Sequence, residues 1–162
     1  MSELLVVGIS DYKVARNPTV LVTYALGSCV GICIYDSRLK IGGLSHIMLP
    51  ESSMFNKNDL NRMKFADTAI VDMVQDLIKL GADPRRLTAK IAGGAQMFDV
   101  QQASMIGTIG DRNVCSVKDT LHKLKIPLIA EDTGLNYGRT VYFDLETGVM
   151  KVQSLGRGTR EL

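Results

Sequence analysis

Apolar and polar positions along this chain repeat in two ways, as short strand-like runs and as longer helical stripes. Short runs of apolar or β-branched residues that end at turn-forming residues predict strands. Such runs occupy residues 4–9, 19–26, 30–35, 43–49, 87–92, 127–130, 139–145 and 149–155. The last two flank Glu146-Thr147-Gly148, a turn sequence that predicts a β-hairpin.

The strongest periodic segment predicts a helix from residue 60 to residue 80, with Asp59 as its N-cap and Gly81 as its C-cap. One continuous buried stripe is expected along this helix, formed by Met63, Ala66, Ile70, Val74, Leu77 and Ile78. A second helix is predicted at about residues 112–124 from the same periodicity. Its inward-facing residues are expected to be Val114, Val117, Leu121 and Leu124.

Strands outnumber helices in this pattern, and the two do not alternate strictly. About eight strands with two helices predict a mixed α+β domain and not a doubly wound parallel sheet. A length of 162 residues suits one domain with a substantial core. We expect residues 1–162 to form that single domain, with residues 156–162 as a loose polar tail.

Composition narrows the possible partners. The net charge is only +2, and no basic cluster is interleaved with aromatic residues, which argues against a nucleic-acid partner. No apolar run approaches the roughly 18 residues of a membrane span, and the N-terminus lacks the basic region of a signal peptide. We therefore expect a cytoplasmic protein that does not insert into membranes.

Three cysteines are too few and too irregular for a disulfide framework or a metal site. His, Asp and Glu show no metal-ligand spacing either, so neither a metal nor a cofactor is expected. Cys33 is central in a predicted strand, where burial makes a thiol inert, and we interpret it as a core residue. Cys115 opens a predicted helix without a partner in the sequence, and a structural role is favoured there as well.

Cys29 is the strongest candidate for chemistry, because it follows Gly27-Ser28 where a strand is broken and backbone N–H groups can be left free. Buried cysteine is common, so the residues alone leave both a catalytic and a structural role open for it. The same choice is open for His46, which lies in an apolar run after two glycines. His122 is interpreted as a solvated helix residue.

A hairpin register offers a way for these two residues to meet. If the turn is centred within residues 36–39, Tyr35 pairs with Lys40, and the same register places Cys29 directly opposite His46. Residues so paired have Cβ atoms roughly 4.5 to 5.5 Å apart, whereas a slip by one residue would put them on opposite faces. The register is a hypothesis, and the activation of a thiol by an imidazole is the chemistry that it would allow.

A thiol–imidazole pair usually needs a third group that fixes the imidazole tautomer. Thr23, on the preceding predicted strand, is the nearest polar candidate, and Ser45 and Ser28 are weaker ones. Threonine is also a common strand former, so the residue type by itself does not assign the role.

The run LGSCVGICIYD followed by GGLSHIMLP resembles the signature of the CheD family, the chemoreceptor glutamine deamidases of bacterial and archaeal chemotaxis. The similarity continues through VGISDYKVARNP, KFADTAIVDMVQDLIKLGA, AKIAGGAQMF and DTGLNYGRTVYFDLETG. One departure is Leu135, where the family pattern has a second glycine after Gly134.

The resemblance implies a fold similar to the catalytic domain of cytotoxic necrotizing factor toxins, with packed mixed β-sheets and helices on one side in α/β/β layers. It also implies that Cys29 is the nucleophile, His46 the base and Thr23 the residue that orients the histidine. Backbone N–H groups of Cys29 and a neighbour would then bind the oxyanion, with Ser28 and Gly27 in supporting positions.

The implied substrates are glutamine side chains on the long helices of methyl-accepting chemoreceptors, so the site is expected to be a shallow surface groove. The resemblance further implies binding to the CheC phosphatase. An alternative is a regulatory binding module that engages and stimulates CheC, with catalysis secondary. A third and weaker alternative is a related Cys-His hydrolase that acts on a small amide or peptide.

Overall fold

The computed structural model describes residues 3–54, 61–97 and 108–162, and within these ranges ten strands form two five-stranded sheets. The outer sheet has the order β1 (Leu4–Val6), β3 (Val20–Leu26), β8 (Arg139–Asp144), β9 (Met150–Ser154) and β10 (Gly158–Glu161). The central sheet has the order β2 (Asp11–Arg16), β5 (Ile41–Ile47), β4 (Val30–Asp36), β6 (Thr88–Gly93) and β7 (Leu128–Thr133). Both sheets mix parallel and antiparallel pairs.

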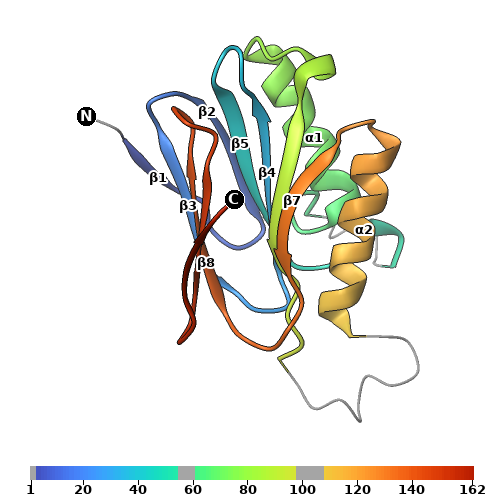
Figure 1. The fold of residues 1–162 in the computed structure, drawn as a ribbon. Coiled ribbons are helices and arrows are strands. Elements are labelled where there is room, and N and C mark those ends of the chain that lie inside the picture. The colour runs from blue at the N-terminus through green and yellow to red at the C-terminus, as the bar shows by residue number, and fades with distance from the viewer. Residues whose placement is uncertain (1–2, 55–60, 98–107) are drawn as a thin grey trace.

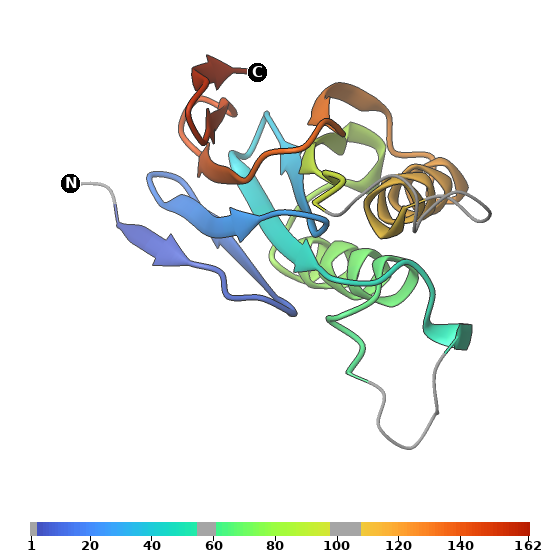
Figure 2. The same ribbon diagram turned by 90° about the horizontal axis from the view of Figure 1, so that it is seen from below.

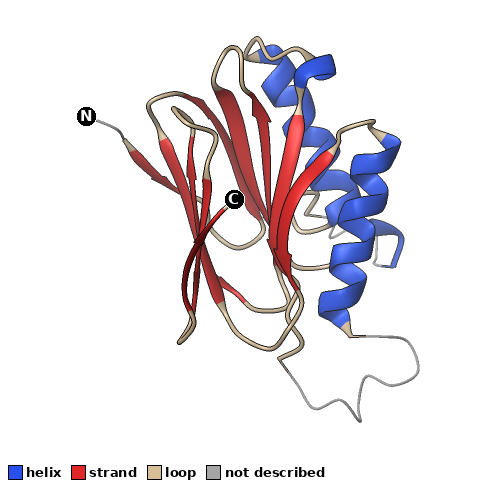
Figure 3. Ribbon diagram, in the orientation of Figure 1, coloured by secondary structure: helices blue, strands red, loops and turns tan. Residues whose placement is uncertain are grey.

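Helices α1 (Ala66–Lys79) and α2 (Ile109–Lys123) cover one face of the central sheet, and the outer sheet covers the other face (Figure 1). Figure 2 shows the same order of layers from below. In Figure 3 both helices lie on one side of all the strands. Two short 3-10 helices, η1 (Ser52–Met54) and η3 (Pro84–Arg86), complete the described elements. The α+β class is confirmed, and the layers follow the order α/β/β.

Side-chain alternation along β4 explains why the central sheet can be covered on both faces. Ile32 and Ile34 are fully buried against the helices, whereas Cys33 and Tyr35 are buried against the outer sheet. The sequence of β4 is therefore a nearly continuous apolar run, as expected when both faces of a strand are covered. The two resulting cores lie on either side of the central sheet.

Two expectations about the elements are wrong, and one strand was missed. Residues 158–161 form β10, which pairs with β9, where the polar composition predicted a loose tail. Strand β2 was not predicted, because its sequence DYKVAR mixes charged and apolar residues. Helix α1 begins at Ala66 and not at residue 60, with Phe65 in the N-cap position, and the expected cap Asp59 lies outside the described residues.

The stripe predicted for α1 is correct at Ala66, Ile70, Val74 and Leu77, which are all buried. Met63 precedes the helix, and Ile78 is 42% exposed on its solvent side. The second helix is confirmed with an earlier start than expected, at Ile109. Cys115 consequently lies in its second turn, exposed, and not at its first residue.

The β4–β5 hairpin has a register that differs by two residues from the hypothesis. Asp36 pairs with Ile41 and Gly31 pairs with His46, so Cys29 is not directly opposite His46. The shift preserves parity, however, so positions 29 and 46 still belong to the same side of the sheet. Cys29 itself precedes β4 by one residue.

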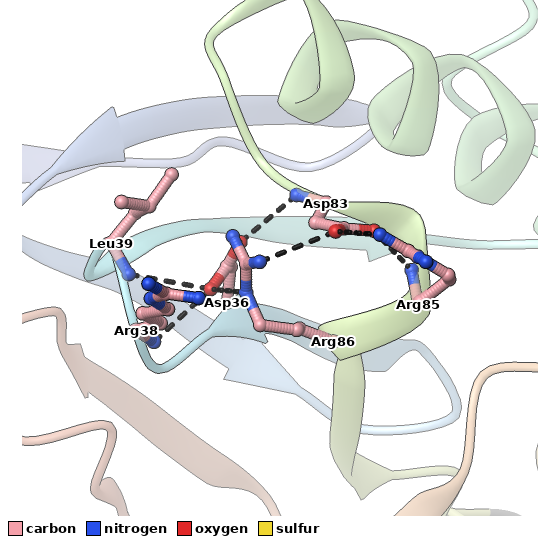
Figure 4. Close-up of polar contacts among 6 residues, drawn as sticks. All are labelled: Asp36, Arg38, Leu39, Asp83, Arg85 and Arg86. Atoms are coloured by element: carbon pink, nitrogen blue, oxygen red, sulfur yellow. Dashed lines mark hydrogen bonds and ion pairs between the residues drawn. The ribbon is translucent and has the colours of Figure 1, made fainter.

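The carboxylate of Asp36, the last residue of β4, explains this register because it hydrogen-bonds to the backbone of the turn (Figure 4). It accepts hydrogen bonds from the backbone N–H groups of Arg38 at 3.1 Å and Leu39 at 3.3 Å. It also accepts from the backbone N–H of Asp83 at 2.9 Å and from Arg86 Nη2 at 2.8 Å. Asp36 therefore stays in the strand, and the turn is made by the next four residues.

Candidate active site

The candidate site lies where the chain crosses from the outer sheet to the central sheet. Residues 27–29 make this crossing between β3 and β4, at the end of the hairpin opposite to its turn (Figure 1). Thr23 comes from β3 and His46 from β5, so the site combines side chains of both sheets. Cys29 is half-buried and packs against the core between the sheets.

A buried hydrogen-bond chain joins His46 to the outer sheet. His46 Nδ1 lies 2.7 Å from Thr23 Oγ1, and Thr23 Oγ1 lies 2.7 Å from the carbonyl oxygen of Val7. A carbonyl can only accept, so the single hydroxyl proton of Thr23 is donated to Val7. Thr23 must then accept from His46, which places the imidazole proton on Nδ1 and leaves a lone pair on Nε2.

The Nε2 nitrogen of His46 is fully buried. His46 is 0% exposed, and its Nε2 has no hydrogen-bond partner among the described residues. Burial lowers the pKa of His46 to about 4, because an imidazolium ion would lose its hydration there. At neutral pH the ring is therefore neutral and able to accept a proton.

Gly31 is the residue paired with His46 on β4, and it carries no side chain there. A Cβ atom at this position would lie 3.1 Å from Leu26 Cδ1 and 3.7 Å from Thr23 Cγ2. The distance to Thr23 is an ordinary van der Waals contact, so a larger residue here would first displace the end of the Leu26 side chain.

The Cys29 thiol and His46 Nε2 do not hydrogen-bond each other in the described structure. The register places them as diagonal neighbours, a relation that in a regular ladder separates residues by roughly 7 to 8 Å. Burial raises the pKa of the Cys29 thiol, against a smaller lowering effect of its own backbone N–H. Both groups are thus neutral at rest.

The crossing segment 27–29 has all of its carbonyl groups fixed. The Gly27 oxygen accepts from Ala95 N at 2.8 Å, and the Cys29 oxygen accepts from Gly94 N at 2.8 Å. The Ser28 oxygen accepts from the side chain of Asn113 at 2.9 Å. Within the described part of the chain, the three N–H groups of this segment donate to no other residue. Free N–H groups beside a thiol can bind an oxyanion.

Sequence reasoning missed the supports of this segment. Gly94, the residue after β6, donates its backbone N–H to the Cys29 carbonyl. Gly93 has φ of +112°, and a Cβ there would come within 2.2 Å of the Cys29 oxygen. The available signal was the pair of glycines directly after a predicted strand. Asn113 and the Val7 carbonyl gave no signal, because their partners are remote in sequence.

Cys33 and His122 lie as the sequence predicts. Cys33 is 1% exposed, and full burial raises the pKa of its thiol. His122 is exposed on α2. Among the weaker candidates, Ser45 is buried with an unpartnered hydroxyl in the described structure, and it does not contact His46 by a hydrogen bond. Thr23 is therefore the polar group that meets the imidazole.

Exposed apolar side chains belong to segments around the crossing. Met48 follows β5 and is 36% exposed, Met97 follows Gly94 and is 48% exposed, and Leu135 is 63% exposed. Leu135 has φ of +61°, the left-handed conformation that suits the glycine of the family pattern, and its carbonyl accepts from Gln96 N at 2.8 Å. An open hollow of about 430 Å³ lies along the outer sheet, and another of about 450 Å³ lies between β7 and β10; neither is lined by Cys29 or His46.

Two further searches concern the described residues alone. No group of three or more His, Cys, Asp or Glu side chains is placed to hold a metal ion there. No helix in the same ranges has the length and apolar character needed to span a membrane.

Comparison with known proteins gives a consistent result over almost the whole chain. A family model described as CheD chemotactic sensory transduction matches residues 48–154. A protein of Moorella thermoacetica is 55% identical over 152 residues, which cover 93% of this chain and 90% of the relative. A protein of Caldanaerobacter subterraneus subsp. tengcongensis is 50% identical over 159 residues, covering 98% of both chains. Both relatives carry the name probable chemoreceptor glutamine deamidase CheD.

Proposed function

This chain belongs to the CheD family, and on that premise we propose that it converts glutamine side chains of methyl-accepting chemoreceptors to glutamate, releasing ammonia. In this proposal Cys29 is the nucleophile, His46 the general base and acid, and Thr23 the residue that orients His46. The observation that carries it is the chain from Val7 through Thr23 to His46, because it leaves a lone pair on Nε2. No cofactor is needed for this chemistry.

The reaction starts from a neutral thiol and a neutral imidazole. His46 Nε2 takes the proton of Cys29, and the thiolate sulfur attacks the carboxamide carbon of the glutamine. The carbonyl oxygen becomes an oxyanion, which the N–H groups of segment 27–29 stabilise. One such donor is typically worth about 10² to 10³ in rate. Ser28 and Gly27 contribute through the backbone and not through their side chains.

The tetrahedral intermediate then collapses with cleavage of the C–N bond. The imidazolium of His46 gives its proton to the leaving nitrogen, so ammonia departs and a thioester on Cys29 remains. Water, deprotonated by His46, attacks the thioester carbon, and the products are glutamate and the restored thiol. General acid–base assistance of this kind contributes roughly 10² to 10⁴ in rate.

The shape of the region supports a protein substrate. Cys29 is half-buried at a crossing between sheets, and the neighbouring Met48, Met97 and Leu135 expose apolar surface that a receptor helix can cover. We also propose that CheC binds the protein, in competition with the receptor where the two surfaces overlap. A cytoplasmic location and a fold shared with the cytotoxic necrotizing factor catalytic domain are parts of the same proposal, the latter supported by the α/β/β layers.

The test is incubation with a purified receptor cytoplasmic fragment, followed by peptide mass spectrometry. Gln-to-Glu conversion is expected with the wild type and with Cys33→Ala, and it is expected to disappear with Cys29→Ala. Conversion that persists in Cys29→Ala would show that the nucleophile is wrongly assigned. Absence of conversion together with CheC stimulation that survives Cys29→Ala would instead favour the regulatory binding module.

A further inference from the structure

One buried side chain on α2 joins the two segments that carry the proposed catalytic residues. Asn113 is 0% exposed, and its amide nitrogen lies 2.9 Å from the Ser28 oxygen and 2.9 Å from the Met48 oxygen. An amide nitrogen carries two protons, so each carbonyl receives one of them. The opposite orientation of the amide would put its oxygen against two carbonyl oxygens, so the contacts fix which end is nitrogen.

The two carbonyls flank the site closely. Ser28 immediately precedes Cys29, and Met48 is two residues beyond His46. The thiol and the imidazole do not hydrogen-bond each other, so their separation depends on the groups that hold these two segments. Asn113 reaches both segments with a single rigid amide.

The two hydrogen bonds that Asn113 donates come with an energetic cost at the oxygen of the same amide. Its Oδ1 atom is buried without a hydrogen-bond partner in the described part of the chain. A buried acceptor left unpaired costs about 1 to 3 kcal/mol. An apolar side chain of similar volume would avoid that penalty but could not donate to either carbonyl.

The first turn of α2 packs closely against residues 94–95, which follow β6. A Cβ atom at Gly110 would come within 2.5 Å of the carbonyl oxygens of both Gly94 and Ala95. Gly94 and Ala95 in turn donate to the carbonyls of Cys29 and Gly27. The helix that carries Asn113 is therefore fixed to the same segment that Asn113 contacts.

We propose that Asn113 is a positioning residue, which sets the distance between the Cys29 thiol and His46 Nε2. The inference rests on the proposed roles of Cys29 and His46. A displacement of about 1 Å at a reacting pair can reduce the rate roughly 10²-fold. The effect should fall on kcat, because Asn113 is buried and does not touch the substrate.

Ser116 offers a matched control on the same helix. It is buried, and its hydroxyl donates to the Pro50 oxygen at 2.6 Å. It therefore ties α2 to the segment after β5, as Asn113 does, but in the described structure it makes no hydrogen bond to residues 27–29. Ser116→Ala removes a hydrogen bond of the same type without releasing the cysteine segment.

The experiment compares Asn113→Ala, Asn113→Asp and Ser116→Ala with the wild type in receptor deamidation and in the pH dependence of Cys29 alkylation by iodoacetamide. We expect kcat to fall roughly 10²-fold in both Asn113 variants with KM nearly constant, and the alkylation profile to shift. Ser116→Ala should match the wild type in both readouts.

Equal kcat and equal alkylation profiles in Asn113→Ala and Ser116→Ala would overturn the inference. It would also be overturned if both Asn113 variants failed to fold while Ser116→Ala folded, since the residue would then be a stability element. A wild type without Cys29-dependent deamidation would contradict the proposed function alone, and the alkylation profiles would still test the control of Cys29 by Asn113.

Discussion

The direction of one hydrogen bond determines what His46 can do. Because Thr23 donates to the Val7 carbonyl, it can only accept from His46, and the histidine tautomer follows. The sequence suggested Thr23 as an orienting residue from its proximity and from the family resemblance. It contained no sign of Val7, whose contribution is a backbone oxygen brought near by the parallel pairing of β1 with β3.

Replacing Thr23 by valine should remove the acceptor for His46 Nδ1 while keeping the side-chain shape. We expect kcat to fall about 10²-fold or more, as when an orienting group is lost from a catalytic triad. Thr23→Ser keeps the hydroxyl and should retain most activity. Nitrogen NMR of the imidazole should report the Nδ1-protonated tautomer in the wild type and a mixture in Thr23→Val. Equal activity of the two variants would contradict the assignment.

The lowered pKa of His46 predicts how stability depends on pH. The folded pKa is about 4 and the ordinary value is 6.5, so between these values the unfolded chain binds more protons than the folded one. The free energy of unfolding should therefore be highest above pH 6.5. As the pH falls toward 4, His46 should lower it by about 3 kcal/mol. Urea unfolding of the wild type and His46→Gln measures it, and parallel pH curves for the two would contradict it.

Among the elements, the β4–β5 hairpin shows where sequence reasoning succeeds and where it stops. Both strands and their pairing were predicted, because the apolar runs and the turn between them are local signals. The register was wrong by two residues, because the carboxylate that fixes it binds Asp83 and Arg86, far along the chain. Strand β10 was missed for a related reason, since its polar, exposed residues become a strand only by pairing with β9.

Asp36→Asn should weaken the hairpin, because the Asp36 side chain is 0% exposed and pairs with Arg86 at 2.8 Å. Burial alone would raise the pKa of Asp36, but the hydrogen bonds from Arg86 and three backbone N–H groups lower it to about 2. We expect a loss of about 2 kcal/mol in the free energy of unfolding at neutral pH, measured with urea. The contribution of Asp36 to the free energy of unfolding should also vanish as the pH falls from about 4 to 2.

Asp83→Asn is the control for this variant. Asp83 takes part in the same cluster but is more exposed, and asparagine can still cap η3 through its side-chain oxygen. A much smaller loss of stability is expected. A loss as large as that of Asp36→Asn would show that surface charge, and not the buried carboxylate, holds the turn.

At the scale of the whole molecule, the site exists only because two sheets pack face to face. Thr23 and His46 belong to different sheets, and Asn113 comes from the helical layer on the far side of the central sheet. A buried ion pair between Arg139 of β8 and Asp132 of β7, at 3.0 Å, also links the sheets. The sequence pattern predicted the α+β class, and the family resemblance implied the α/β/β layers and the candidate catalytic residues. It could not supply contacts between layers, which follow from packing and not from local pattern.

The proposed docking of a receptor helix on the exposed apolar residues near the crossing predicts the effect of a charge placed there. Leu135→Asp should raise KM for the receptor fragment about tenfold, a loss of roughly 1.4 kcal/mol in binding, and leave kcat nearly unchanged. Leu39→Asp is the control, because Leu39 is 46% exposed in the hairpin turn at the opposite end of β4. Steady-state kinetics would contradict the docking surface if the two variants had equal KM values.

The thioester on Cys29 is the central claim, and hydroxylamine trapping tests it most directly. Hydroxylamine competes with water for a thioester, so reaction with the receptor fragment should convert part of the modified glutamine to a hydroxamate, located by peptide mass spectrometry. The account predicts glutamate and hydroxamate at the same residue with the wild type and Cys33→Ala, and neither with Cys29→Ala. Hydroxamate formed by Cys29→Ala, or glutamate formed by the wild type without any hydroxamate, would contradict it.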